Sequence, residues 1–271
     1  MILACITVMA FLVHVITSGE SLSEYADKHP EAAYGTVTFS ETEGTAPEAT
    51  EAPAEENDEE TEQDLNEETR LPDREPVFYA ELLTPQLIET IKGISIPAEG
   101  VPELDFEDLR LLHITFVNFE GVEEVGEMIC NKSIAEDLLL IFRELYVSGY
   151  QIESMQLVEA FEGSDDRSMA ANNTSCFNYR NIGKSSRLSR HGYGMAVDIN
   201  PVYNPEIKYG SDGEIAAVNP AGSENYVNRD GSPHRIDEND LAYRLFTERG
   251  FIWGGSWNSS TDYMHFEKPG Y

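Results

Sequence analysis

The segments SRHGYGMAVDIN (Ser189–Asn200) and DYMHFE (Asp262–Glu267) decide the fold of this chain, because each contains a short strand with polar side chains on one face. Side chains alternate between the two faces along a strand. In the first segment the residues predicted to face the core are Met195, Val197 and Ile199. Asp198 therefore points to the opposite side, toward a candidate site.

His191 lies seven residues before Asp198 in the same segment. Because seven is an odd number, an unbroken strand would send the two side chains to opposite faces. Glycine adopts turn conformations that other residues avoid, and Gly192 and Gly194 follow the histidine. We therefore predict a turn that brings His191 and Asp198 to one point.

The second segment follows the same pattern. Met264 and Phe266 are apolar and are predicted to face the core, whereas His265 and Glu267 point to the polar side. Asp262 is expected in the turn just before this strand. Both segments therefore deliver polar side chains from short strands to one region.

His191, Asp198 and His265 form a set of two imidazoles and one carboxylate. Three such ligands leave the fourth position of a tetrahedral zinc ion open for water. Imidazole with carboxylate suits zinc better than magnesium or calcium, which prefer oxygen ligands. We therefore expect one zinc ion, although each histidine considered singly also suits a structural hydrogen-bonding role. The remaining histidines are interpreted as structural residues: His14, His29, His113 and His234.

The pattern SxHxxGxAxD (Ser189–Asp198), followed by DxxHF (Asp262–Phe266), resembles the family of zinc D-alanyl-D-alanine carboxypeptidases and L-alanyl-D-glutamate endopeptidases. Members of that family cut the stem peptides of peptidoglycan, and their fold is shared with the Hedgehog signalling domain. The resemblance extends from Val77 to Tyr271. Three further segments look like the VanY-like branch: Ser164–Arg180, Ile199–Pro205 and Gly250–Trp257. The resemblance implies an α+β fold with a small antiparallel sheet and flanking helices, Hedgehog/DD-peptidase-like.

Carried over residue by residue, the resemblance implies that His191, Asp198 and His265 bind zinc and that Asp262 is the general base. Many relatives have glutamate in place of Asp262, so the shorter aspartate changes the geometry more than the chemistry. The implied reaction is hydrolysis of an amide bond by metal-activated water. Carboxypeptidase and endopeptidase members share these motifs, so the sequence leaves open which stem-peptide bond is cut.

A non-catalytic, zinc-containing cell-wall binding module is the alternative, which the fold shared with Hedgehog would allow. Such a module needs no base three residues before the third ligand, and this chain retains Asp262 there. The sequence therefore favours the peptidase.

The cationic group that stabilises the oxyanion is assigned to Arg180, with Arg167 as the alternative. Many relatives carry this arginine in a Ser-Gly-Tyr-Arg-Ser segment, where the present chain has DDRS (Asp165–Ser168). Arg180 is preferred because Phe177 and Tyr179 are expected to hold its backbone in a strand, and it is also expected to bind substrate. A surface arginine without a role is the simpler alternative.

Four other residues near the motifs are candidates for contacts in the cleft. Ser189 either hydrogen-bonds the substrate or forms a turn, and both roles suit a serine. Trp257 is expected to bind substrate, whereas Trp253 either lines the cleft or packs in the core. Glu267 is expected to orient a zinc ligand.

Hydrophobic periodicity predicts further strands and helices outside the motifs. The run LLHITFVNF (Leu111–Phe119) predicts one strand and MQLVEAF (Met155–Phe161) predicts another. Ser133 and Glu136 form a capping box at the start of a helix that ends at Gly149.

A second helix is predicted to begin at Asp237 and to stop at Arg249-Gly250. The apolar positions expected on the buried faces of the two helices are Ile134, Leu138, Ile141, Phe142 and Leu145 in the first, and Leu241, Leu245 and Phe246 in the second.

The chain is predicted to consist of a signal peptide or membrane anchor (1–19), an acidic low-complexity disordered linker (20–76) and a zinc peptidase domain (77–271). The first part is almost wholly apolar but lacks a basic start, and its length lies between those of a signal-peptide core and a membrane span. Few large apolar residues and strong self-repulsion prevent the linker from folding. We therefore expect an extracytoplasmic protein, secreted or anchored to the outer face of the cytoplasmic membrane. Whether the first part is cleaved stays open.

The chain has 50 acidic and 18 basic residues, and its formal net charge of −32 argues against a nucleic-acid partner. Lysine and arginine have to neutralise phosphates before such binding has useful affinity. The expected partners are peptidoglycan stem peptides, bound by a monomer. Three cysteines rule out a disulfide-rich scaffold. Cys130 and Cys176 either pair after export or are small core residues.

Overall fold

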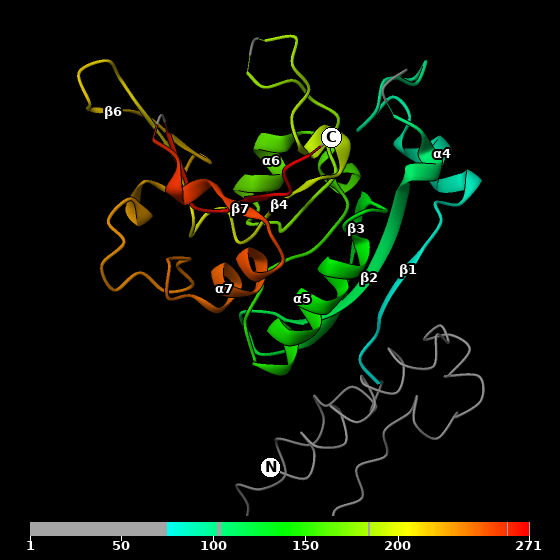
Figure 1. The fold of residues 1–271 in the computed structure, drawn as a ribbon, viewed down its shortest axis with the longest axis horizontal. Helices are drawn as coiled ribbons and strands as arrows, with labels where there is room; N and C mark the ends of the chain where they lie inside the picture. Colours follow the sequence, from blue (N-terminus) through cyan, green and yellow to red (C-terminus); the bar gives the residue numbers. More distant parts are fainter. Residues whose placement is uncertain (1–74, 102–103, 184, 259, 271) are drawn as a thin grey trace, which may run out of the picture. The chain divides into compact units, whose positions relative to one another are not determined.

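A computed structural model of the chain describes residues 75–101, 104–183, 185–258 and 260–270 (Figure 1). The predicted signal peptide or anchor and nearly all of the predicted linker lie outside these ranges, as do two of the histidines interpreted as structural. The division of the chain into three parts therefore remains a prediction. None of the described helices is long and apolar enough to span a membrane.

A three-stranded antiparallel sheet opens the described part of the chain, in the order β1 (Phe78–Glu81), β2 (Leu109–Val117) and β3 (Glu123–Asn131). The strand predicted at 111–119 is confirmed as β2, although it starts and ends two residues earlier. Most of its side chains are buried or half-buried on both faces, because other parts of the chain cover the sheet on each side.

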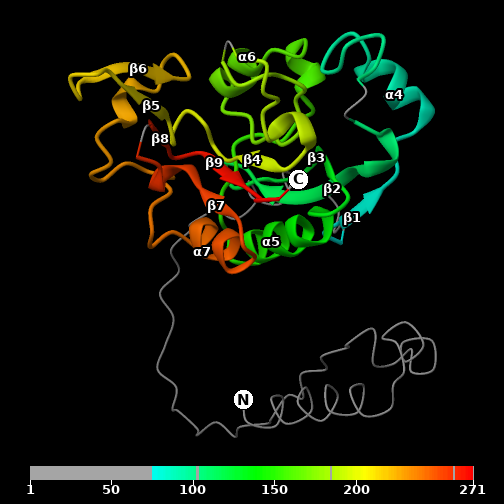
Figure 2. The same cartoon turned by 45° about the horizontal axis from the view of Figure 1, so that its top comes forward.

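Helix α5 (Ala135–Val147) covers one face of this sheet (Figure 2). The apolar residues predicted for its buried face are all buried: Ile134, Leu138, Ile141, Phe142 and Leu145. Helix α7 (Leu241–Glu248) packs against α5, and the rings of Phe142 and Phe246 meet edge to face with centroids 6.3 Å apart. Of the apolar residues predicted for α7, Leu245 and Phe246 are buried in the same core, and Leu241 is partly buried against it.

The start of α5 differs from the prediction. The Ser133 hydroxyl donates to Asn131 Oδ1 at 2.8 Å instead of capping the helix. Ile134 occupies the N-cap position and makes no side-chain cap bond. The predicted capping box is therefore wrong, because an asparagine at the end of β3 takes the serine hydroxyl.

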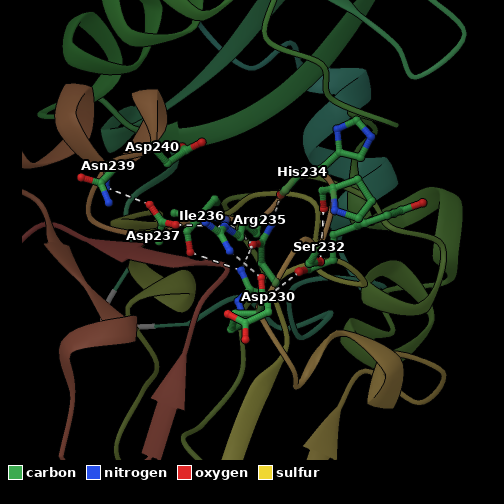
Figure 3. A network of polar contacts seen from close by, with 12 residues as sticks. Asp230, Ser232, His234, Arg235, Ile236, Asp237, Asn239 and Asp240 are labelled. Carbon is green, nitrogen blue, oxygen red and sulfur yellow. Dashed lines mark hydrogen bonds and ion pairs between the residues drawn. The ribbon is translucent and has the colours of Figure 1, made fainter.

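The N-terminus of α7 is capped by Asp240, whereas the sequence predicted Asp237. Asp240 Oδ1 accepts a hydrogen bond from the backbone N–H of Ala242 at 2.8 Å. Asp237 accepts one from the backbone N–H of Asn239 at 2.8 Å and pairs with Arg235 at 3.0 Å (Figure 3). The Asp237 carboxylate is thus already engaged in the preceding turn.

Both helices stop where the sequence predicted, at glycines in the left-handed region. Gly149 has a φ of 68° and Gly250 a φ of 75°. At each end the glycine N–H donates to the carbonyl three residues back, and the next N–H donates to the carbonyl five residues back. This Schellman arrangement satisfies the last carbonyls of the helix, and the glycine adopts it without steric cost.

The strand predicted at Met155–Phe161 is wrong. Its last residues form a 3₁₀ turn, Val158–Phe161. Upstream of the turn, the backbone N–H of Gln156 donates to Asn173 Oδ1 at 2.8 Å and its carbonyl accepts from Asn173 Nδ2 at 3.0 Å. An asparagine side chain therefore supplies the hydrogen bonds that a neighbouring strand would otherwise make.

Buried asparagines support the loops of the C-terminal half in the same way. Asn173, Asn200 and Asn204 are each 0% exposed. The Asn200 amide bonds to the backbone of Gln151 and Glu153, and that of Asn204 bonds to four backbone groups in two loops. A buried amide left unpaired would cost about 1–3 kcal/mol. These side chains therefore replace regular secondary structure as the support of the loops.

Two further antiparallel sheets of three strands lie in the C-terminal half (Figure 2). One has the order β4-β9-β7, with β4 (Ala196–Asp198), β9 (His265–Glu267) and β7 (Ile252–Trp253). The other has the order β6-β5-β8, with β6 (Ile215–Asn219), β5 (Glu206–Tyr209) and β8 (Ser260–Asp262). The remaining described helices are α4 (Pro85–Ile91) and α6 (Asp165–Ala170). The other 3₁₀ turns are Phe106–Asp108, His191–Tyr193, Glu224–Tyr226 and Gly254–Ser256. The predicted α+β class is confirmed, with three small sheets in the described residues where one was expected.

Candidate metal centre

His191 enters the candidate centre from the 3₁₀ turn His191–Tyr193, which ends at Gly194. Gly194 has a φ of 66°, and a Cβ atom there would lie 2.7 Å from the backbone nitrogen of Asn131. Conformation and space therefore both exclude a side chain at this position. The predicted turn is confirmed, and it leads directly into β4.

Asp198 ends β4, and antiparallel pairing places it opposite His265 on β9. The next pair in the register, Val197 and Phe266, is fully buried at 0% exposure. Met264 is buried as well, as the sequence predicted. Because the core side of both strands fixes the register, Asp198 and His265 are held side by side on the other face.

The three side chains meet in a buried cluster. His265 Nδ1 lies 2.9 Å from Asp198 Oδ1, and His191 Nε2 lies 3.2 Å from Asp198 Oδ2. The two imidazole nitrogens are 3.2 Å apart. All the candidate ligand atoms lie within 4.8 Å of one another. The structure thus brings together the three residues that the sequence proposed as ligands.

The outer ring nitrogen of each histidine has its own partner. His191 Nδ1 donates to the backbone carbonyl of Cys176 at 2.6 Å, and His265 Nε2 lies 3.3 Å from Glu267 Oε2. A carbonyl and a carboxylate only accept, so we assign the protons to these outer nitrogens. The inner nitrogens lie beside Asp198 and become metal ligands when they carry no proton, and this donor set fits a zinc ion.

The Cys176 carbonyl was missed by sequence reasoning, because a backbone group leaves no side-chain signal. The contact of Glu267 with His265 agrees with the orienting role predicted for that carboxylate.

The charges of the cluster reinforce one another. Burial opposes the ionised form of Asp198, yet the two imidazoles hold the pKa of its carboxyl well below its usual range. Burial also opposes the charged form of His265, but its contacts with Asp198 and Glu267 raise its pKa to about 10. The surroundings therefore stabilise positive charge between these side chains, which suits a metal cation.

Asp262 lies beside the cluster but on a different sheet. It is the last residue of β8, whereas the sequence placed it in a turn, because Asp262 and the two residues before it pair with β5. Its Oδ1 atom is buried and accepts no hydrogen bond from the described residues. Burial, together with the charges of Asp198 and Glu206, raises the pKa of Asp262 to about 8, although His265 and Arg180 oppose the shift. An unpaired carboxylate oxygen next to three candidate ligands is available to accept a proton.

Of the two candidate arginines, the structure places Arg180 near the cluster. Its charge acts on Asp262, its Nη2 pairs with Asp165 Oδ2 at 2.9 Å, and its Nε is buried without a partner among the described residues. Arg167 is exposed and pairs with Glu162 at 2.8 Å. The prediction of a strand around Arg180 is wrong, because this segment forms only an isolated β-bridge, at Asn181.

The remaining predicted site residues divide between the cluster and the core. Ser189 Oγ accepts a hydrogen bond from the backbone N–H of His191 at 3.3 Å, so it serves the turn. Trp253 is buried in the core, and its Nε1 donates to the carbonyl of Tyr263 at 2.9 Å. The half-buried Trp257 ring lies next to His265, with ring centroids 5.1 Å apart.

The two cysteines of the described chain are structural. Cys130 and Cys176 are both free and buried in one hydrophobic core. Burial raises the pKa of each thiol, so neither has the thiolate that a nucleophile requires. The sequence left open a disulfide or a role as small core residues, and the structure agrees with the second interpretation.

Residues 183–268 match the family model described as D-alanyl-D-alanine carboxypeptidase. The matched range contains the three clustered residues and Asp262, whereas Arg180 lies just before it. No curated protein matches the chain, and no solved structure does. The match supports a peptidase of this family in general terms. The individual roles of the site residues remain predictions.

Proposed function

We propose that this chain is a zinc-dependent peptidase that hydrolyses amide bonds in peptidoglycan stem peptides, as a D-alanyl-D-alanine carboxypeptidase or an L-alanyl-D-glutamate endopeptidase. The observation that carries the proposal is the meeting of His191, Asp198 and His265 beside Asp262, whose buried Oδ1 atom has no hydrogen-bond partner among the described residues. The match to the carboxypeptidase family model supports the same reaction class.

The three clustered side chains would hold one zinc ion through two imidazole nitrogens and a carboxylate. When bound, zinc lowers the pKa of its water from 15.7 toward about 7. The rings of His191 and His265 are held in the orientation that zinc binding requires, because the Cys176 carbonyl and the Glu267 carboxylate bind their outer nitrogens. Both histidines act as neutral ligands, so a metal ion and a proton compete for the same inner nitrogens.

Asp262 acts as the general base: its carboxylate takes a proton from the attacking water and delivers it to the departing amine. It must be ionised before the attack, and burial without a metal raises its pKa to about 8. The Asp262 carboxylate would be favoured in its ionised form by a divalent cation held on the neighbouring residues.

Arg180 supplies positive charge on the side of Asp262. Its guanidinium is held by Asp165 at 2.9 Å while its buried Nε keeps a free hydrogen among the described residues. A fixed cation of this kind stabilises the negative oxygen that develops on the attacked carbonyl carbon. Trp257, half-buried against His265, offers an apolar surface to the substrate next to the reacting bond.

The test is incubation of the purified protein with muropeptides, with and without a chelator, followed by product masses. Loss of the terminal alanine identifies a carboxypeptidase, and cleavage after the first alanine identifies an endopeptidase. Absence of both products from zinc-loaded protein would contradict the proposal. Retention of the muropeptides on the protein in that case would favour the zinc-containing binding module.

We further propose that the protein works outside the cytoplasm, where its substrate lies, as a monomer. The apolar residues 1–19 and the acidic stretch that follows support export with a flexible connection to the membrane. Fractionation of cells with an antibody against the domain tests the location, and recovery in the cytoplasm alone would contradict it.

A further inference from the structure

A tight turn lies against the segment that carries Asp262 and His265. It runs through the 3₁₀ residues Gly254–Ser256 and is closed by the N–H of Trp257, which donates to the Gly254 carbonyl at 3.1 Å. The turn is tied to that segment at its start, because Trp253 Nε1 donates to the carbonyl of Tyr263 at 2.9 Å. It is in contact again at its end, where the Trp257 ring lies 5.1 Å from the His265 ring.

Between these two contacts, the backbone of Gly254 lies against both Asp262 and His265. A Cβ atom on Gly254 would lie 2.7 Å from the carbonyl oxygen of Asp262, 2.9 Å from Asp262 Cβ and 3.2 Å from His265 Cβ. Real Cβ atoms essentially never come closer than 3.0 Å to such neighbours. The first two of these neighbours belong to the backbone and the root of a side chain, so they cannot move aside as the tip of a long side chain could.

The backbone of Gly254 does not itself require glycine. Its φ is not positive, whereas Gly194, which follows the turn that carries His191, has a φ of 66°. A glycine at this place is therefore explained by space alone: the turn has to approach the Asp262–His265 segment more closely than any side chain allows.

We propose that Gly254 is a positioning residue that sets the spacing between the Asp262 carboxylate and the His265 imidazole. The turn holds Asp262 and His265 at their Cβ atoms through Gly254, while Trp257 holds the His265 ring from the side. Since Asp262 and His265 lie on different sheets, this turn is a direct physical link between the base and the third ligand. The inference rests on the proposed function for its catalytic consequence, although not for its structural one.

The test is Gly254→Ala, compared with Gly210→Ala as a matched control. A Cβ on Gly210 would come within 3 Å of one atom only, the carboxylate tip of Asp212 at 2.6 Å, which can swing away. We expect Gly254→Ala to lower kcat by about 10²-fold with little change in KM, because a displacement near 1 Å between reacting groups has an effect of this size. With cobalt(II) in place of zinc, its visible absorption spectrum should shift. The control should match the parent protein in both measurements.

A Gly254→Ala protein with the parent kcat and the parent cobalt spectrum would overturn the proposal. If that variant fails to fold, Trp253→Phe decides, since it removes the bond to the Tyr263 carbonyl but keeps an aromatic ring in the core. It should change kcat and the spectrum in the same direction but less, and unchanged values would overturn the proposal. If the parent protein hydrolyses no muropeptide, the proposed function fails, and the cobalt spectra still decide whether Gly254 sets the geometry of the centre.

Discussion

At the scale of single residues, the candidate centre depends on partners behind its ligands. His191 and His265 present different nitrogens to Asp198, Nε2 from one ring and Nδ1 from the other. The choice follows from the outer contacts, a backbone carbonyl for the first ring and the Glu267 carboxylate for the second. Hydrogen bonds behind the ligands thus orient both rings before any ion binds.

Replacement of Asp262 by asparagine should leave zinc bound but lower kcat by about 10²–10⁴-fold, the usual contribution of a general base. Asparagine keeps the size of the side chain and lacks a basic oxygen. Zinc content by atomic absorption and turnover on muropeptides are the two measurements. Asp212→Asn in an exposed loop is the control, and parental turnover in Asp262→Asn would remove this residue from the mechanism.

Replacement of His191 by alanine should remove most of the bound zinc. The metal stabilises only the folded state, by about 2.7 kcal/mol when its concentration is one hundred times the dissociation constant. Excess zinc should therefore raise the melting temperature of the parent protein and have little effect on His191→Ala. His113→Ala, which removes a histidine paired with Glu81 on the first sheet, is the control. An equal zinc response in His191→Ala would discard that ligand.

At the scale of elements, the helices show where local patterns suffice and where they do not. The buried faces of α5 and α7 and their glycine stops follow from spacing alone. The N-caps depend on neighbours elsewhere in the chain. The hydroxyl of Tyr150, which follows the end of α5, donates to Asp240 Oδ1 at 3.2 Å. This contact from a distant residue favours Asp240 over Asp237 as the cap of α7.

Asp240→Ala should lower the free energy of unfolding by about 1–2 kcal/mol, because it removes the cap and leaves the Tyr150 hydroxyl without its acceptor. Asp240→Asn keeps an oxygen in the same place and should be nearly neutral. Urea unfolding of both variants measures the difference. Equal losses in the two variants would show that charge, and not capping, is what Asp240 contributes.

The stability of the parent protein and that of Asp240→Asn should depend on pH differently, and the direction of the difference is defined. Burial raises the pKa of Asp240 above its usual 3.8, so the folded state holds this proton more tightly than the unfolded state does. Stability from this group is present below pH 3.8 and is lost as the pH rises through the raised pKa. Relative to Asp240→Asn, the parent protein should therefore lose stability as the pH rises from 3 toward neutrality. A gain over that range would contradict the shift.

At the scale of the whole molecule, the candidate centre draws on separate parts of the described chain. Asp198 and His265 come from one sheet, Asp262 from another and His191 from a 3₁₀ turn. Buried asparagines and a tight glycine turn hold these parts together where regular secondary structure is sparse. The groups described for the candidate centre all lie between residues 176 and 267 of the chain.

Deletion of residues 20–75 should therefore leave kcat and KM on soluble muropeptides unchanged, because an acidic tether adds no group to the centre. Activity on intact cell walls should fall if the stretch determines how far the domain reaches. Turnover of the deleted and full-length chains on both substrates is the measurement. A large loss on soluble muropeptides would show a direct contribution of this stretch to catalysis.

Local patterns in the chain were enough for the α+β class, for the two main helices with their glycine stops, and for the polar side chains on the strands around Asp198 and His265. Alternation and helical periodicity depend only on neighbours along the sequence, so they can be recognised without coordinates. The resemblance of the two motifs supplied the proposed roles, which neither pattern contains.

The folded arrangement was needed for the rest. The failed strand at 155–161, the transfer of the α7 cap to Asp240 and the position of the Arg180 side chain each depend on a partner elsewhere in the chain, namely Asn173, Tyr150 and Asp165. The close approach of Gly254 to the base and the third ligand belongs to the same group. Hydrogen bonds and steric contacts act through space, so no local pattern records them, and only the packing of distant segments brings such partners within reach.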